Sequence, residues 1–401
     1  MEQQRVIFSK DLRQSLTDAV SLCPHDKLFI LTDETTRQCC LPVVSDIDCM
    51  QGARVITIGA TDQHKNLESL SHVWSELQQG GATRHSLMIN LGGGMVTDLG
   101  GFAASTFKRG LAYINIPTTL LSMVDASVGG KTGINFGGLK NEIGVFNNAS
   151  SVILDTTFLH TLDHENLLSG YAEMLKHALI SDEKMWAEHI NFEIGNLKFD
   201  IYDYPAAESQ SQASNSKLQT SNSKLQTSNF KLQTSNFKLQ TSNIQSMLAD
   251  SVAVKQRIVT EDPTEKGLRK ALNLGHTAGH AFESLSFERC NLSPLTSHLS
   301  PLLHGYAVAY GLIVELYLSA VKTGFPTDRM HQTVQYIKEH YGRMAITCDD
   351  YPHLIELMHH DKKNEGNTIN FTLLGGIGDI RINQTATEDE IKEALDFYRE
   401  C

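Results

Sequence analysis

The stretch "HSLMINLGGGMVTDLGG" (85–101) decides the fold class. A short apolar run of strand length enters a series of glycines, and the residues after them are expected to begin a helix. Such glycines let the backbone approach a pyrophosphate, with the N–H groups of the helix N-terminus facing the anion. The motif departs from G-x-G-x-x-G because position 97 is Thr. It therefore predicts either a nucleotide site or a plain glycine turn in which Asp98 is an acidic residue of the first helical turn.

The neighbouring segments extend this pattern in both directions. Residues 66–81 carry apolar residues at helical spacing, and four further runs have strand length: 26–33, 53–59, 111–119 and 150–155. This alternation predicts a mostly parallel sheet covered by helices. After about residue 160 the segments become helix-like: 164–180, 244–262, 305–324 and 330–342. We therefore expect an α/β domain over residues 1–159 and a mainly α-helical domain over residues 160–401.

Composition and charge exclude several classes of protein. The net charge of −12 argues against a nucleic-acid or anionic-membrane binder, because both need a basic surface. The sequence contains no run of about 18 apolar residues, so we expect no membrane span. The N-terminus lacks an apolar signal core. The seven cysteines form no CxxC pair, so they favour reduced thiols and a cytoplasmic protein.

A seven-residue unit repeats about four times over residues 214–243. Its apolar positions lie two and five residues apart, whereas a coiled coil needs spacings of three and four. Frequent Ser, Thr and Asn also oppose a stable helix. We therefore expect a disordered, polar surface insertion at about residues 205–243.

Several polar residues in the second half suit a catalytic site. Glu173 and Lys176 lie three residues apart on a predicted helix, a spacing most typical of a surface ion pair. In "NLGHTAGHAFE" (273–283), His276 and His280 share one helical face, and His304 precedes another predicted helix. Histidines and a carboxylate from separate helices can form a catalytic metal site, which uses three protein ligands. The same histidines could equally be core residues.

Lys131 lies in "VDASVGGKTGIN" (124–135), which superficially resembles a P-loop. Asp125 occupies the position where a P-loop requires glycine, so a kinase or ATPase is disfavoured. A lysine in a glycine-rich loop nevertheless suits a phosphate or carboxylate ligand.

Seven segments together resemble the 3-dehydroquinate synthases, in the family's order: GGGMVTDLGGFAASTFKRG, IPTTLLSMVDASVGGKTGIN, KNEIGVF, SGYAEMLKH, GLRKALNLGHTAGHAFE, LLHGYAVAYG and DKKNEG. The resemblance implies a Rossmann-like N-terminal domain, a helical C-terminal domain, NAD and one divalent metal, zinc or cobalt. The family converts 3-deoxy-D-arabino-heptulosonate 7-phosphate to 3-dehydroquinate and phosphate, in the shikimate pathway of aromatic amino acid biosynthesis. The reaction proceeds by transient oxidation of the substrate by NAD, β-elimination of phosphate, re-reduction and intramolecular aldol closure.

The resemblance also implies roles for individual residues. The metal ligands would be Glu173, His276 and His304, and the catalytic group would be His280, Lys176, Asn141, Lys131 and Glu265. Substrate contacts would come from Asp125, Lys131, Asn141, Lys176, Lys255, Arg269, Asn273, His280 and Lys362, and from Arg109 of a neighbouring subunit in a homodimer. NAD contacts would come from Asp62, Gln63, His64, Lys65, Gly94, Met95, Val96, Thr97, Asp98, Thr118, Thr119, Lys131, Lys140, Phe158, Leu159, His160 and Thr161. Proton handling at the substrate C5 hydroxyl is our hypothesis for His280.

Three departures from the family pattern affect these expectations. Asp62 stands where a glutamate usually meets the NAD ribose, and Tyr306 replaces a glutamate after the histidine–glycine pair. Residues 286–301 are expected to form a long loop between two proposed ligands. The alternatives are a cyclase acting on sedoheptulose 7-phosphate or glucose 6-phosphate, a metal-dependent polyol dehydrogenase, and an inactive nucleotide-binding relative.

Overall fold

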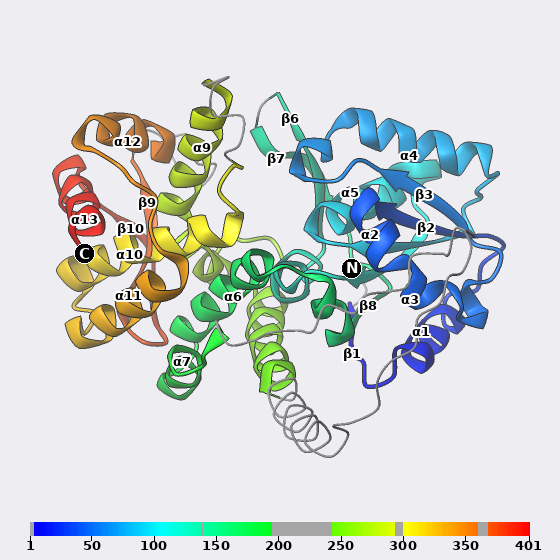
Figure 1. Ribbon diagram of the computed structural model, residues 1–401, viewed down its shortest axis with the longest axis horizontal. Helices are drawn as coiled ribbons and strands as arrows, with labels where there is room; N and C mark the ends of the chain where they lie inside the picture. The colour runs from blue at the N-terminus through cyan, green and yellow to red at the C-terminus, as the bar shows by residue number, and fades with distance from the viewer. Residues whose placement is uncertain (1–3, 138, 195–242, 293–299, 360–367) are drawn as a thin grey trace, which may run out of the picture.

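The computed structural model describes residues 4–137, 139–194, 243–292, 300–359 and 368–401. Figure 1 shows an α/β part and a mainly helical part side by side. The expected repeat insertion falls almost entirely outside the described residues, as does Lys362.

The N-terminal part is built on a six-stranded, all-parallel sheet of order β1-β8-β5-β4-β2-β3. Its strands are β1 (Arg5–Phe8), β2 (Leu28–Asp33), β3 (Arg54–Ile58), β4 (Leu87–Gly92), β5 (Ala112–Pro117) and β8 (Ser151–Leu154). Its helices are α1 (Leu12–Ser21), α2 (Glu34–Cys39), α3 (Leu41–Ser45), α4 (Leu67–Gln79) and α5 (Gly94–Thr106). Strands β2, β4 and β8 are buried along their whole length, as expected for near-continuous apolar runs in a parallel sheet.

The opening stretch forms the centre of this sheet. Strand β4 leads through Gly93 into α5, most of which is buried. A Cβ atom at Gly100 would lie only 2.8 Å from a Leu31 methyl carbon, so this glycine permits α5 to lie close to the sheet. Strand order reverses between β2 and β4, and ligands of open α/β sheets bind beyond the carboxyl ends of strands at such a point.

The sequence did not predict a two-stranded antiparallel hairpin, β6 (Lys131–Phe136) and β7 (Leu139–Phe146), where we expected a glycine-rich loop. Short helical turns complete this part: η1 (Asp48–Met50), η2 (Asp62–His64), η3 (Phe107–Arg109), η4 (Ser122–Ala126) and η5 (Thr156–Thr161).

The helical part contains α6 (His164–Leu179), α7 (Glu183–Ile190), a helix over residues 243–261, α9 (His276–Leu292), α10 (His304–Thr323), α11 (Thr327–Tyr341), α12 (Tyr351–His359) and α13 (Glu388–Glu400). Among the described residues it also contains the short turns η7 (Leu268–Asn273) and η9 (Cys348–Asp350) and an antiparallel hairpin, β9 (Asn370–Gly376) and β10 (Asp379–Thr385). The fold class predicted from the sequence is thus confirmed. The expectation of a loop from residue 286 was wrong, because α9 continues to Leu292.

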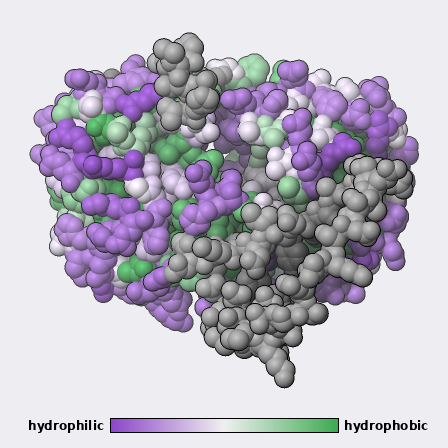
Figure 2. Space-filling view, viewed as in Figure 1, coloured by the Kyte–Doolittle hydropathy of each residue, from purple (hydrophilic) through white to green (hydrophobic). Residues whose placement is uncertain are grey.

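Helices α6 and α10 form the core of the helical part. By length and hydropathy, α10 alone among the described helices could cross a membrane, but 72% of its apolar window is buried inside the protein. It is therefore better explained as a core helix. Hydrophilic residues cover most of the coloured surface in Figure 2.

Candidate active site

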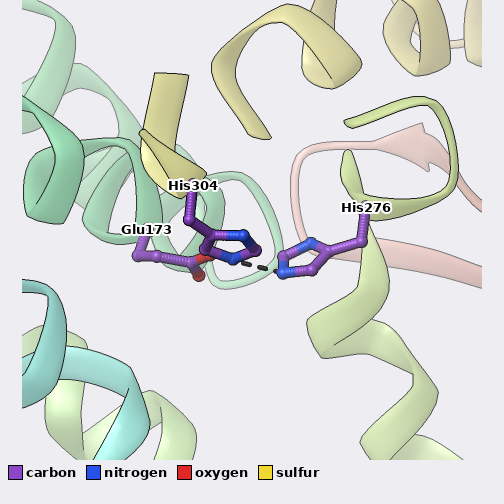
Figure 3. A group of neighbouring side chains, drawn as sticks. All are labelled: Glu173, His276 and His304. Carbon is purple, nitrogen blue, oxygen red and sulfur yellow. Dashed lines mark ion pairs between the residues drawn. The ribbon is translucent and has the colours of Figure 1, made fainter. Parts of the chain in front are cut away.

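Three potential metal ligands converge from three helices. Glu173 lies within α6, and His276 and His304 are the first residues of α9 and α10. Figure 3 shows the three side chains pointing toward one another. Glu173 Oε1 lies 3.3 Å from His276 Nε2 and 3.6 Å from His304 Nε2. The structure thus brings together the three residues that the resemblance selected.

These separations fit a divalent metal ion. Zinc bonds of about 2.0–2.2 Å in tetrahedral geometry place neighbouring ligand atoms about 3.3–3.6 Å apart. Within the described ranges, neither carboxylate oxygen of the fully buried Glu173 has a hydrogen-bond partner of good geometry. Lys176 forms an ion pair with this carboxylate, and both side chains are buried, so the expected surface ion pair is wrong. A cation bound at Glu173 would complete its coordination.

Glycines bring the three ligand-bearing helices close together. A Cβ atom at Gly305 would collide with the backbone of Ser169 on α6. One at Gly311 would collide with the Gly275 carbonyl group and lie 2.6 Å from the backbone nitrogen of Gly279 on α9. Since real Cβ contacts shorter than 3.0 Å essentially do not occur, both helix crossings depend on the missing side chains.

A buried carboxylate also fixes the start of α9. Both oxygens of Glu315 on α10 accept backbone hydrogen bonds, from Gly275 at 2.6 Å and from Ala278 at 3.1 Å. They satisfy N–H groups that the first turn of a helix leaves without intrahelical partners. Glu315 thereby holds the turn that carries His276. Sequence reasoning missed this residue, although a lone acid in the apolar run "GLIVELYL" was a signal.

His304 contacts carboxylates through both ring nitrogens. Nε2 faces Glu173, and Nδ1 lies 3.4 Å from Glu283 Oε2 on α9. Burial alone would lower the pKa of His304, but Glu283 and Glu173 outweigh it and raise the pKa to about 10. Sequence reasoning gave no role to Glu283, although it lies one turn after His280 in the quoted motif.

His280 lies beside this group, with its ring centroid 5.4 Å from that of His276 and 5.8 Å from that of His304. A second candidate cluster of His280, Glu283 and His304 therefore shares one histidine with the first. Both carboxylates have a lysine partner. The cluster containing Glu173 fits a metal better, because neither Glu173 oxygen accepts a hydrogen bond of good geometry from the described residues, whereas Glu283 Oε1 accepts one from Lys140 at 2.6 Å.

Charged residues of the two parts meet around the candidate ligands. Lys255 Nζ lies 2.5 Å from Asp125 Oδ1, and Arg269 donates to the Gly129 carbonyl oxygen at 3.2 Å. Although burial favours the neutral carboxyl, Lys255 holds the pKa of Asp125 well below its usual range. These contacts place two predicted substrate cations at the boundary between the parts.

A second group of predicted substrate residues meets at Glu265. Lys131 on β6 lies 2.5 Å from Glu265 Oε2, and Asn273 donates to Glu265 Oε1 at 3.0 Å. Glu265 has a positive φ of 61°, an uncommon conformation for this residue type. Lys131, Glu265 and Asn273 thus form one polar cluster across the boundary.

The predicted NAD residues gather at the carboxyl edge of the sheet. Asp62–His64 form η2 after β3, Gly94–Asp98 begin α5 after β4, and Thr118 and Thr119 follow β5. Lys65 Nζ contacts Asp98 at 2.6 Å and Asn141 at 2.5 Å. The N-cap of α5 is Gly93, so no side chain of the N-cap residue competes for the N–H groups of the first helical turn.

Some predicted contacts are limited to the main chain. The side chains of Val96, Phe158 and Leu159 are buried in the core, so only their backbone could meet a cofactor. Arg109 is exposed and lines a surface pocket together with Phe146.

Two family models and a full-length relative match this chain. The sequence model of the 3-dehydroquinate synthase N-terminal family matches residues 55–169. The sequence model of the C-terminal family matches residues 217–364. A 3-dehydroquinate synthase from Parabacteroides distasonis is 48% identical over 400 residues, which cover 100% of this chain and 99% of the relative.

Two solved structures share the fold. One is 2-epi-5-epi-valiolone synthase from Streptomyces hygroscopicus with NAD+ and Zn2+ bound, with a TM-score of 0.75 and 23% identity over 100% of this chain and 98% of that one. The other is 2-deoxy-scyllo-inosose synthase complexed with carbaglucose-6-phosphate, NAD+ and Co2+. Its TM-score is 0.73 and its sequence identity 18%, and the alignment covers 98% of this chain and 96% of that one. The family models and the full-length relative go beyond the fold: this chain belongs to the 3-dehydroquinate synthase family.

Proposed function

We propose that the protein converts 3-deoxy-D-arabino-heptulosonate 7-phosphate to 3-dehydroquinate and phosphate. The observation that carries this proposal is the convergence of Glu173, His276 and His304 beside a cluster of cations. The substrate has a carboxylate and a phosphate, so it needs fixed cations even in a chain of net charge −12. The full-length likeness to a 3-dehydroquinate synthase supports the same substrate.

We further propose that NAD and one divalent metal ion take part. The cradle around Gly93, Lys65 and Asp98 would hold NAD, and the buried Glu173 with two histidines would hold zinc or cobalt. When bound, NAD would accept and return a hydride, and the metal would polarise substrate hydroxyls. The related cyclases solved with NAD+ and Zn2+ or Co2+ support this choice.

The chain's own residues would bind, orient and move protons. Lys255, Arg269 and Lys131 would hold the anionic groups, which fixes the sugar in one orientation. His280, half-buried beside the ligand group, would exchange a proton with the C5 hydroxyl.

Phosphate release tests the proposal. With NAD and zinc or cobalt, we expect release from the heptulosonate, no net NADH, and loss of activity with a chelator. Release from sedoheptulose 7-phosphate or glucose 6-phosphate alone would identify a different cyclase. Accumulation of NADH from a polyol would identify a dehydrogenase, and no metal binding with no turnover would identify an inactive relative.

We also propose a homodimer in which Arg109 completes the neighbouring active site. Lys108 and Arg109 have positive φ angles of 49° and 72°, so this exposed turn is held in an uncommon conformation. It adjoins the β6–β7 hairpin, which exposes Phe136, Leu139 and Phe146 and so offers an apolar surface to a second copy.

Mixing two inactive variants tests this arrangement. A dimer of one Arg109→Ala chain and one His276→Ala chain would contain one intact site if Arg109 acts in trans. Random mixing would then restore about a quarter of the wild-type activity. If Arg109 acts within its own chain, the mixture stays inactive.

A further inference from the structure

Glu283 contacts both parts of the molecule at once. It lies on α9 with its side chain 9% exposed. Oε1 is 2.6 Å from Lys140 Nζ on β7 of the α/β part, and Oε2 is 3.4 Å from His304 Nδ1 on α10. One carboxylate therefore links the β6–β7 hairpin of the α/β part to His304, a candidate metal ligand of the helical part.

The same row of charges continues toward the sheet edge. Lys140 Nζ also lies 3.4 Å from Asp62 Oδ2, and Asp62 accepts a hydrogen bond from Asn135 on β6 at 3.1 Å. Negative and positive groups thus alternate along a row formed by Asp62, Lys140, Glu283 and His304. The last member of this row is either a protonated histidine or, with the proposed metal bound, an imidazole that binds the metal. The row runs from the predicted NAD ribose contact to the predicted metal.

We propose that Glu283 is a positioning residue. Through Lys140, it couples the turn η2, which carries the predicted NAD contact Asp62, to the proposed metal ligand His304. This inference rests on the proposed function, because it takes NAD and the metal as the ligands. A carboxylate that accepts the Nδ1–H proton fixes the tautomer and orientation of a ligating histidine, which leaves Nε2 directed at the metal.

The residue after the histidine–glycine pair does not supply this carboxylate. Position 306 would supply an acid in the family pattern, but Tyr306 packs against the Tyr341 ring at a centroid distance of 5.2 Å. Among the described residues, Glu283 supplies the carboxylate that faces His304 Nδ1. Because the same carboxylate binds Lys140, a ligand that orders Lys140 also orders His304.

Binding measurements on metal-free protein test the coupling without substrate. Cobalt(II) absorption gives the metal dissociation constant, and calorimetry gives that of NAD with and without cobalt. In the wild type, we expect saturating cobalt to tighten NAD binding about 5-fold or more. Glu283→Ala should weaken cobalt binding about 10- to 100-fold and shift its visible spectrum. Both Glu283→Ala and Lys140→Ala should remove the effect of cobalt on NAD binding.

Two further variants keep the test decisive. Lys322→Ala breaks a Lys–Glu pair of the same 2.6 Å length elsewhere in the helical part and should change neither constant. Glu283→Gln retains the shape of the side chain, so it replaces Glu283→Ala if that variant does not fold. Cobalt affinity within 2-fold of wild type in the folded variant, or NAD binding indifferent to cobalt in the wild type, overturns the proposal. Coupled binding without phosphate release from the heptulosonate would instead overturn the substrate assignment alone.

Discussion

Replacing Gly311 by alanine should separate two of the proposed metal ligands, His276 and His304, without changing either residue. Gly311 lies two turns after His304 on α10, where α9 crosses. Its new Cβ atom would lie 2.6 Å from the Gly279 nitrogen and closer still to the Gly275 carbonyl oxygen, whereas at least 3.0 Å is required. The helices must therefore part by roughly 1 Å, because packed interiors cannot absorb such an overlap.

That displacement is large for a metal site. Ligand distances must hold within about 0.2 Å, so a shift of this size effectively removes His276 from the ligand set. We expect cobalt affinity to fall at least 100-fold, or about 2.7 kcal/mol. Overpacking should also cost about 1–3 kcal/mol of folding free energy. Cobalt titration and denaturant unfolding measure the two effects.

Gly376→Ala is the matched control, because its Cβ would meet nothing within 4 Å and its φ is not positive. It should retain wild-type metal affinity. Gly311→Ala with wild-type metal affinity and stability would refute the idea that this helix crossing sets the ligand spacing.

Three other variants test the remaining assignments. His276→Ala should lose cobalt binding, whereas His280→Ala should keep cobalt and NAD but lose turnover; equal metal loss would make both residues ligands. Lys176→Met should lower the melting temperature of the metal-free protein and enlarge its rise on adding zinc, because the buried Glu173 then lacks its lysine partner and gains more from a bound cation; an unchanged rise would contradict this. Burial lowers the pKa of His189 from 6.5 to about 4. As the pH falls, His189 is therefore protonated in the unfolded chain before it is protonated in the folded protein, and the free energy of unfolding decreases between pH 6.5 and 4. Denaturant titrations at several pH values measure this decrease, and His189→Phe should reduce it by about 1.4 kcal/mol per pH unit.

The sequence predicted the parallel sheet well because its strands are buried. Runs such as 26–33 and 85–94 are apolar on both faces, and they became β2 and β4 with ends shifted by a few residues. Strand β1 is only four residues long, too short to carry a pattern. Hairpin β6–β7 was missed because its glycines suggested a loop. Helix α9 ran past residue 286 because no glycine or proline occurs before Pro294.

The sequence, through its resemblance to a known family, indicated which residues form the candidate site. It did not indicate which of them contact one another. The resemblance selected Glu173, His276 and His304, and spacing alone left the histidines between ligand and core roles. Burial of the Glu173–Lys176 pair depends on how α6 packs against other helices, which no local pattern records. The link from Glu283 to Lys140 joins residues 143 positions apart, so it emerges only from the tertiary fold.

The position of the ligands along the chain also sets an order of assembly during synthesis. Strand β8, which fills the place between β1 and β5, ends at Leu154, so the ribosome has made the whole parallel sheet before it adds Glu173. The third ligand, His304, follows 131 residues after Glu173. Since domains generally fold as units from the N-terminus during translation, the α/β part can fold on the emerging chain while the helical part is still incomplete. Loading of the proposed metal would then be a late step, and a cell short of that metal would accumulate chains whose first half is already folded.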